Sequence, residues 1–419
     1  MIRLAFGLSL LLIAGTAQAN TLTVATWNLG WHMSRDEAAA WIKKCSAPFT
    51  KNIQSGKWEP ASEGTPGWEL RWGRDAPISW DIANWAPCDV YKANFKIVHV
   101  TEAAYRKRDE QIADLIRSRL KADIIAFQEV TGVQAIRDVL PDNGKDYQIC
   151  SYDAFKVQRL GFAWKKELGA GECKTEIPLS LPQLPVKDQV RPGLLLTLNI
   201  EKERFHLFNV HLKSSCVTPV ESEPGNTRGA LAGDNPHCQI LQQQIMPLEN
   251  WIERAGENGD RLIVLGDFNR AVWHELHLNE PVRTDGSSPV GPLTNSAKVN
   301  SLLREVNDGS PTSSNLSLLP ERCPVSTEAQ ASCAIAEAPA DKTAWREATK
   351  ALAAANELGC RNPVGLDHIL LGPGLSAPGA MKLPLQRMGR TLAANATHPD
   401  PLLSLSDHCP LVADVTISP

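Results

Sequence analysis

Short apolar runs recur along the chain, and several of them end directly at polar residues. Runs rich in Val, Ile, Leu and Phe between turn residues are typical of buried β-strands. They predict strands at 21–27, 122–127, 147–151, 160–164, 194–200, 205–210, 261–265, 366–371 and 411–416. Apolar positions at helical spacing predict helices at 101–120, 133–140, 238–253 and 342–358. Helices that alternate with buried strands indicate an α/β fold.

One of these strands runs into the sequence Gly266-Asp267-Phe268-Asn269. Enzymes of the α/β class usually keep their reactive groups at the carboxyl ends of strands. Asp267 and Asn269 are therefore candidate site residues. Taken alone, the same four residues also fit an ordinary turn, in which both polar side chains bind their own backbone.

Other predicted strands also begin or end at residues that can carry chemistry. These residues are Asn28, Glu129, His211, Asp367, Asp407 and His408. Glu129 stands just beyond a buried strand, where a plain surface glutamate is a weaker expectation. Asn28 also fits a turn, and a lone histidine such as His211 is often a structural hydrogen bonder.

Two long stretches, at about 31–100 and 273–362, interrupt the alternation and are interpreted as insertions. The first holds seven of the 12 tryptophans. This density indicates a packed subdomain, with aromatic rings offered to bases, sugars or lipid as the alternative. In the second, residues 281–330 are rich in Pro, Ser, Thr and Asn and predict a loop.

Residues 1–19 combine an apolar run with the small-x-small pattern Ala17-Gln18-Ala19 and predict a secretory signal peptide. The run is too short for a membrane anchor. Ten cysteines in such a chain predict disulfides and a secreted or periplasmic location. Zinc binding is disfavoured because no Cys-x-x-Cys pair exists. Cys216 and Cys238, which bracket the loop after His211, are predicted to form a disulfide that restricts this loop.

The formal net charge of −4 argues against a pure nucleic-acid-binding module, which usually presents a large positive patch. A metallonuclease remains compatible, because a bound divalent cation supplies positive charge locally. The basic residues occur in short clusters. Among them, Arg106 and Arg108 near the start of the helix at 101–120 are candidates to flank a phosphate track.

Six motifs at predicted strand ends follow one another in a distinctive order. They are Trp27-Asn28, Gln128-Glu129-Val130, His211-Leu212, Gly266-Asp267-Phe268-Asn269, Leu366-Asp367-His368 and Ser406-Asp407-His408. This ordered set resembles the endonuclease/exonuclease/phosphatase superfamily over residues 21–30, 101–272 and 363–417. The resemblance implies one domain at 20–419. Its fold would be a four-layer α/β/β/α sandwich of two mixed β-sheets flanked by helices, with the site at one end of the sheet pair.

The resemblance also implies a metal site for phosphodiester cleavage, in which a cation neutralises the charge that develops on the phosphoryl oxygens. Glu129 would be the primary ligand, with Asn28 and Asp407 nearby. These oxygen donors suit Mg²⁺, with Mn²⁺ or Ca²⁺ as alternatives.

By the same resemblance, Asp267 and Asn269 would position or deprotonate the attacking water. His408, oriented by Asp367, would stabilise or protonate the phosphoryl oxygens. His211 corresponds to a second histidine found in the deoxyribonuclease-like and sphingomyelinase-like branches.

Gln158 marks a departure from the family pattern. In the deoxyribonuclease-like branch a glutamate stands there and pairs with the second histidine. An amide does not raise the pKa of an imidazole as a carboxylate does, so His211 is expected to act as a neutral hydrogen bonder. Gln158 itself is a candidate substrate-binding residue.

The resulting hypothesis is a secreted metal-dependent phosphodiesterase, a nuclease that hydrolyses DNA, with RNA as a further substrate left open. A lipid-headgroup phosphodiesterase of sphingomyelinase type is the alternative, with membrane lipid as its partner. A third possibility, a catalytically inactive binding protein of the same fold, is disfavoured because every charged motif position is filled. The inositol-phosphate branch is set aside, since its Trp-Cys-Asp-Arg box is replaced here by Leu366-Asp-His-Ile. No obligate protein partner is indicated, and nothing in the sequence points to an oligomeric state.

Overall fold

The structure is a computed structural model with 419 residues. The described residues are 21–73, 77–153, 156–222, 228–231, 233–277, 302–306, 311–361 and 365–418. The predicted signal peptide and residues 281–301 of the predicted loop lie outside them. Among the described residues, no helix is both long and apolar enough to cross a membrane.

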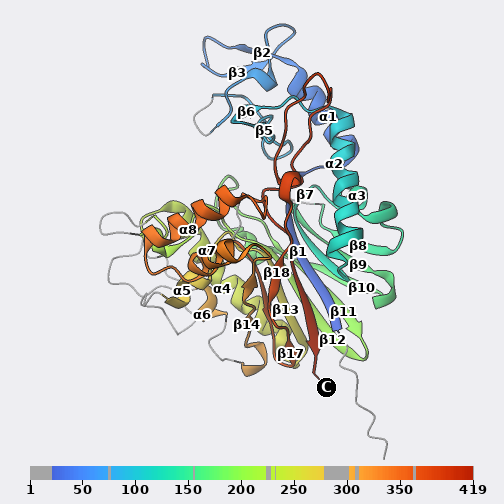
Figure 1. Cartoon of the computed structure of the whole chain (residues 1–419), viewed down its shortest axis with the longest axis vertical. Coiled ribbons are helices and arrows are strands. Elements are labelled where there is room, and N and C mark those ends of the chain that lie inside the picture. Colours follow the sequence, from blue (N-terminus) through green and yellow to red (C-terminus); the bar gives the residue numbers. More distant parts are fainter. Residues whose placement is uncertain are drawn as a thin grey trace, which may run out of the picture.

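Two mixed β-sheets form the centre of the molecule (Figure 1). The first sheet has the order β15 (Glu321–Arg322), β18 (Ala380–Lys382), β19 (Leu411–Ile417), β1 (Thr21–His32), β7 (Ile124–Val130), β9 (Arg159–Lys165) and β8 (Tyr147–Ser151), with β17 (Leu375–Ser376) also paired to β19. The second has the order β10 (Gly171–Glu176), β11 (Gly193–Ile200), β12 (Glu203–His211), β13 (Arg261–Asp267), β16 (Asp367–Leu371) and β14 (Ser317–Leu318). Both sheets are mixed, because β1–β7 and β12–β13 pair in parallel and most other strands antiparallel.

Successive side chains of a strand enter two different hydrophobic cores, because each sheet is buried on both faces. Along β1, Leu22 and Val24 point into the core between the two sheets, whereas Ala25 and Trp27 pack in the core beneath the helices. This alternation follows from the two-residue period of side chains along a strand. The inter-sheet core also takes side chains from β7, β11, β12, β13 and β16.

Helices cover the outer faces of both sheets. The longer ones are α2 (Glu102–Leu115), α3 (Val133–Val139), α4 (Pro236–Gly256), α7 (Thr327–Glu337) and α8 (Lys342–Ala355). The first sheet shares its outer core with residues of α2, α3, α7 and α8, and the second shares its outer core with α4. Helix, sheet, sheet and helix are thus four layers, which confirms the predicted sandwich.

The first insertion is a small subdomain at one end of the sandwich (Figure 1). Its elements are α1 (Arg35–Ser46), β2 (Pro48–Lys51), β3 (Trp58–Pro60), β4 (Thr65–Pro66), β5 (Lys92–Ala93) and β6 (Lys96–Ile97). Trp41 and Trp68 are buried and meet edge to face at 5.2 Å between ring centroids. Trp72, Trp80 and Trp85 pack against the same core. The tryptophans therefore build a core here, as the packing interpretation predicts.

Within the second insertion, the prediction of a loop at 281–330 is wrong for part of its described residues. Besides α5 (Trp273–His277), the insertion contains α6 (Leu302–Glu305), β14, β15 and α7. The side chain of Ser326 accepts the backbone N–H of Ala329 and so caps α7. Polar residues that resembled loop composition are in this case a helix start.

The ten cysteines form five disulfides, as the sequence predicts. The pairs are Cys45–Cys88, Cys150–Cys173, Cys216–Cys238, Cys323–Cys333 and Cys360–Cys409. The predicted bridge between Cys216 and Cys238 is confirmed. A second bridge joins the edge strands β8 and β10 of the two sheets. A third fixes the residue that follows His408.

Candidate active site

Strand register brings the predicted site residues to one end of the sheet pair. His211 lies opposite Asp267 in the parallel pair β12–β13, and Asp267 lies opposite Asp367 in the antiparallel pair β13–β16. Asn28 comes from β1 of the other sheet, and its Nδ2 donates to Asp267 Oδ2 at 2.9 Å. This hydrogen bond joins the two sheets at the candidate site.

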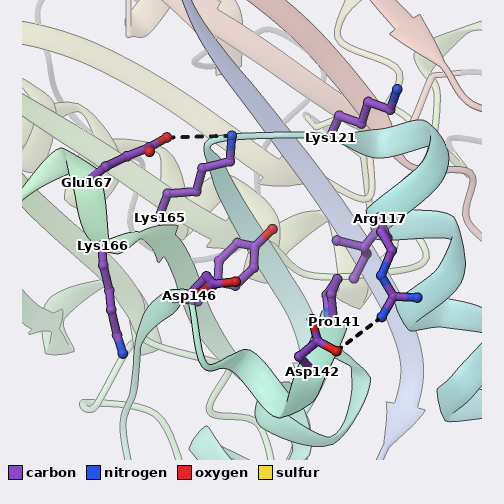
Figure 2. Close-up of a pocket in the computed structure, with 10 residues that line it drawn as sticks. Arg117, Lys121, Pro141, Asp142, Asp146, Lys165, Lys166 and Glu167 are labelled. Atoms are coloured by element: carbon purple, nitrogen blue, oxygen red, sulfur yellow. Dashed lines mark ion pairs between the residues drawn. The ribbon is translucent and has the colours of Figure 1, made fainter.

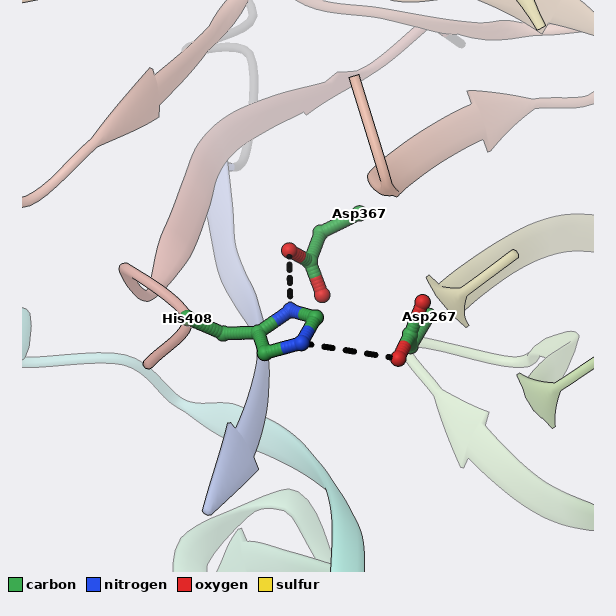
Figure 3. A group of neighbouring side chains, drawn as sticks. All are labelled: Asp267, Asp367 and His408. Atoms are coloured by element: carbon green, nitrogen blue, oxygen red, sulfur yellow. Dashed lines mark hydrogen bonds and ion pairs between the residues drawn. The ribbon is translucent and has the colours of Figure 1, made fainter. Parts of the chain in front are cut away.

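Asp267, Asp367 and His408 form a compact group that we call the acidic cluster (Figure 3). One ligand atom of each lies within 4.8 Å of the others, and all three residues are buried. His408 Nδ1 donates to Asp367 Oδ2 at 2.9 Å, and its Nε2 lies 3.8 Å from Asp267 Oδ2. The imidazole therefore stands between two carboxylates.

The charges of this cluster shift its proton affinities in a consistent way. Burial disfavours a charged His408, but the carboxylates of Asp367 and Asp267 outweigh burial and raise the pKa of His408 well above its usual value. Burial raises the pKa of Asp267 to about 7, with Asp367 adding to the rise and His408 opposing it. His408 is consequently a cation at neutral pH, held inside a site with excess negative charge.

The Gly266–Asn269 segment forms a turn and also carries two residues of the candidate active site. Asp267 Oδ1 accepts the backbone N–H of Asn269 at 2.7 Å, and Asn269 Nδ2 donates to the carbonyl of Leu212 at 3.1 Å. Gly266 has φ +147°, and a Cβ there would lie 2.1 Å from the carbonyl oxygen of Val210. Only glycine allows the two backbones to come this close, so the turn that fixes Asp267 requires Gly266.

Glu129 occupies a strained position next to this group. Its φ is +58°, and the pairing of β7 with both neighbouring strands shifts register around it. A non-glycine residue in this conformation at a β-bulge is often found at functional sites. Glu129 Oε2 accepts the N–H of Trp31 at 3.0 Å, and Oε1 lies 3.7 Å from His211 Nε2.

The three predicted metal ligands surround residues 28–31, the part of β1 where its register with β7 shifts. Asn28 belongs to this stretch, and its Oδ1 accepts the N–H of Gly30 at 2.9 Å. Glu129 accepts the N–H of Trp31 in the same stretch. Asp407 lies across from Gly30, because a Cβ on that glycine would be 3.4 Å from Asp407 Oδ1. The structure thus brings these predicted ligands to a common place.

His211 is buried, and its Nε2 lies 3.5 Å from Asp267 Oδ2. Its Nδ1 has no hydrogen-bond partner among the described residues. Burial, followed by the positive charges of Arg191, His408 and Lys213, lowers the pKa of His211 well below its usual value. His211 is therefore neutral at neutral pH, in keeping with a hydrogen-bonding role.

Gln158 does not reach His211 through any recorded hydrogen bond between described residues. Instead, its carbonyl accepts Arg191 Nε at 2.9 Å, and its Oε1 accepts the Nη2 group of the same guanidinium. Gln158 thus orients Arg191, a residue that the sequence analysis missed.

The structure contradicts the prediction that Arg108 contacts phosphate, because only 1% of this residue is exposed. Its guanidinium donates to the carbonyls of Leu29 and Leu405, at 2.7 Å and 2.5 Å. Arg108 therefore joins the end of β1, which carries Asn28, to the segment before His408, and it is too buried for the predicted contact with phosphate. Arg106 is exposed and lies 3.4 Å from Glu102, so its contact with substrate stays a prediction.

Sequence reasoning also missed Lys156 and Lys213, which lie near Arg191. Lys213 could have been noticed, because it follows His211 by two residues. Lys156 and Arg191 stand in loops with no recognisable motif. Their approach to the site depends on contacts between segments far apart in the sequence.

A separate depression of about 630 Å³ lies away from these residues (Figure 2). Its lining includes Arg117 in the short π-helix after α2, Lys165 at the last position of β9, and Lys166 directly after it. Arg117 pairs with Asp142 at 3.7 Å, and Lys165 pairs with Glu167 at 3.8 Å. No predicted site residue lines it, and two of its cations, Arg117 and Lys165, are paired with carboxylates of the same lining.

The chain belongs to the Endonuclease/Exonuclease/phosphatase family, whose model matches residues 52–408. It is similar to the solved structure of ANGEL2, a 2′,3′-cyclic phosphatase in complex with adenosine-2′,3′-vanadate, with 13% identity over 97% of this chain and 100% of that chain and a TM-score of 0.47. A family protein from Bacteroides thetaiotaomicron matches with 12% identity over 96% and 100% and a TM-score of 0.44. The mannosyl-6-phosphatase Bt3783 of Bacteroides thetaiotaomicron VPI-5482 matches with 12% identity over 94% and 99% and a TM-score of 0.42. No curated protein matches the chain significantly.

Members of this family hydrolyse phosphoester bonds and generally depend on a divalent metal. The donors around residues 28–31 fit such an ion, because hard cations prefer carboxylate and amide oxygens. The acidic cluster supports the same conclusion, since Asp367 Oδ1 is buried without a hydrogen-bond partner among the described residues. A nearby cation would offset this excess of buried negative charge.

Proposed function

We propose that this protein is a secreted, metal-dependent phosphodiesterase that hydrolyses nucleic acid, with DNA as its first substrate. The observation that carries the proposal is the acidic cluster, in which a charged imidazole stands between two buried carboxylates beside Asn28 and Glu129. A group of this kind suits the hydrolysis of a phosphodiester, whose transition state gathers negative charge on oxygen.

In the proposed reaction, Glu129, Asn28 and Asp407 would hold a divalent cation, which would neutralise negative charge on the phosphoryl oxygens. Asp267, fixed by the side chain of Asn28 and the backbone of Asn269, orients the attacking water and takes its proton. The water oxygen bonds to phosphorus as the bond from phosphorus to the leaving oxygen breaks, and the leaving oxygen takes a proton from solvent.

His408 supplies a positive charge and an N–H to the phosphoryl oxygens, and Asp367 holds its ring through Nδ1. Since Asp367 engages Nδ1, the phosphoryl oxygen would be bound on the Nε2 side of the ring, which faces Asp267 Oδ2 at 3.8 Å. Neutral His211 orients a phosphoryl oxygen through a hydrogen bond.

Secretion is proposed from two independent features. The first is the signal-peptide pattern at residues 1–19. The second is the set of five disulfides, which pair all ten cysteines. Stable disulfides are rare in the reducing cytosol and common outside it.

A lipid-headgroup phosphodiesterase is the second candidate, and one observation favours it. Phe95 at the β5–β6 turn is 100% exposed, and Ile53 in the turn between β2 and β3 is 98% exposed. Exposed apolar tips on a subdomain can enter a membrane interface. The tryptophans of the same subdomain argue the other way, because they pack into its core.

The two candidates differ in a direct assay. Purified protein with Mg²⁺ should degrade plasmid DNA and leave sphingomyelin vesicles intact. EDTA should stop the reaction, and excess Mg²⁺ should restore it. Rapid hydrolysis of sphingomyelin with inert plasmid DNA would reverse the ranking, and undiminished hydrolysis in EDTA would rule out the metal-dependent mechanism.

A further inference from the structure

Arg191 and Lys213 lie close enough to His211 for their charges to act on it, and Lys156 lies close to Arg191. Lys213 follows this histidine on the same segment. Arg191 is bound to Gln158 through its Nε and Nη2, and Lys156 Nζ donates to the carbonyl of Gln189 at 3.2 Å. The segments 156–158 and 189–191 are therefore held together. We call Lys156, Arg191 and Lys213 the basic cluster.

Charges within this cluster shift the pKa values of its two lysines. Burial followed by the charge of Arg191 lowers the pKa of Lys156. Burial, Arg191 and Lys156, in that order, lower the pKa of Lys213. Arg191 is also the largest charge effect on buried His211. Three like charges in partly buried positions repel one another, and an anion between them would relieve this repulsion.

Asp188 partly compensates the charge of Lys156, so an external anion is inferred from the other two members of the cluster. Neither Arg191 nor Lys213 forms a salt bridge within the part of the chain that the structure describes. Arg191 binds the neutral oxygens of Gln158, and Lys213 Nζ donates to the carbonyl of Ser214 at 3.1 Å. The guanidinium of Arg191 is thus oriented by neutral groups, and its Nη1 has no hydrogen bond to a described residue. This arrangement is suited to binding an external anion.

We propose that Lys156, Arg191 and Lys213 bind a phosphate group that neighbours the phosphodiester undergoing hydrolysis. The proposal rests on the proposed function, since it places the scissile phosphate at the acidic cluster next to His211. A planar guanidinium and two ammonium groups match the oxygens of a phosphate dianion or diester. A polynucleotide carries such a neighbouring phosphate, whereas a simple diester does not. The cluster would therefore select polynucleotides.

The test compares two substrates and two double variants. The substrates are a single-stranded oligonucleotide and bis(para-nitrophenyl) phosphate, a diester without a neighbouring phosphate. The variants are Arg191→Ala/Lys213→Ala and, as the control, Arg117→Ala/Lys166→Ala, which removes two exposed cations at the far depression. The quantity measured is kcat/KM for each substrate.

For Arg191→Ala/Lys213→Ala, the ratio of kcat/KM on the oligonucleotide to that on the small diester should fall by about ten-fold or more, chiefly through KM, because each charge-assisted contact is worth about that factor. The control should retain the wild-type ratio. An equal loss on both substrates, or no loss on the oligonucleotide, would overturn the proposal.

A binding measurement separates this proposal from the proposed function. Anisotropy of a fluorescein-labelled oligonucleotide, recorded in EDTA, reports binding without turnover. The double variant should bind about ten-fold more weakly, and its dependence of log Kd on log salt should be shallower by about two. Unchanged binding with retained hydrolysis would contradict the basic cluster alone. If the wild-type protein hydrolyses neither substrate but binds the oligonucleotide more tightly than the double variant does, the proposed function alone would be contradicted.

Discussion

Asp367 and His368 are neighbours on β16, but their side chains enter two different buried networks. Asp367 belongs to the acidic cluster with Asp267 and His408. His368 belongs to a second group, which we call the balanced cluster, with Glu321 and Lys382. The Nδ1 atom of His368 lies 3.0 Å from Glu321 Oε1, and its Nε2 donates to the carbonyl of Arg270 at 2.8 Å.

The two clusters differ in how their charges are compensated. The contrast holds for the most deeply buried carboxylate of each cluster. In the balanced cluster, burial would raise the pKa of Glu321, but Lys382 and His368 outweigh burial and lower it to about 2. The less buried Glu337 beside them has its pKa raised to about 7 by burial and by the charge of Glu321. In the acidic cluster, burial raises the pKa of Asp267 to about 7. A buried group with matched partners stabilises one conformation, whereas an unmatched one is prepared for a ligand. This difference separates the proposed active site from a structural network one residue away.

The largest expected effect is that of His408→Ala. Loss of the charged imidazole should lower kcat by about 10³-fold, with little change in KM, because its interaction with the phosphoryl oxygens strengthens in the transition state. The matched variant is His368→Ala in the balanced cluster. It should lower the melting temperature while the folded fraction keeps kcat within about ten-fold of wild type. Equal losses of kcat in the two variants would remove the distinction between the clusters.

Glu321→Gln should destabilise the protein by about 3 kcal/mol, because it removes the carboxylate that is ion-paired with the buried ammonium of Lys382. Chemical denaturation measures this change, and the m-value should stay constant. The double variant Glu321→Gln/Lys382→Met is the control and should recover part of the loss. Wild-type stability in the single variant would show that the ion pair contributes nothing.

Asp367→Asn should lower kcat by about 100-fold, less than His408→Ala does, since the imidazole remains but loses the carboxylate at its Nδ1. The same change should lower the pKa of His408, because Asp367 is the largest charge effect that raises it. A histidine titration by nuclear magnetic resonance measures this pKa. An unchanged pKa would mean that Asp367 does not control the charge of His408.

The smallest expected effect is a pH dependence of stability. The pKa of Glu321 is about 2 in the folded protein, against 4.5 for an unperturbed glutamate. Its stabilising contribution is thus complete above about pH 4.5 and is lost as the pH falls toward 2. The difference in free energy of unfolding between wild type and Glu321→Gln should shrink by about 2 kcal/mol over this window. A constant difference across the window would contradict the assigned pKa.

Local patterns predicted most of the fold and of the candidate site. The strands that deliver Asn28, Glu129 and Asp267 are apolar runs with polar ends, and this signal is contained in neighbouring residues. The predicted helix at 101–120 is also present, as α2 followed by a short π-helix at Ile116–Leu120. α1 was not predicted, although Ser34 and Glu37 form a capping box at its start.

What the sequence did not reveal depends on contacts between distant segments. Arg108 reads as part of a charged helix surface, although it shares a helical face with Ala104 and Ile112, and this spacing indicated burial. Arg191 reaches the site only because Gln158, 33 residues away, binds its guanidinium. No local pattern encodes such a contact.

The most direct test of the difference between the two clusters is the position of a bound cation. Crystals soaked in Mn²⁺, with anomalous scattering recorded near the manganese edge, would locate it. We expect a peak in contact with Glu129, next to the acidic cluster, and its loss in Glu129→Gln. A peak at Glu321, or none near Glu129 at a manganese concentration that supports hydrolysis, would contradict the assignment of the active site.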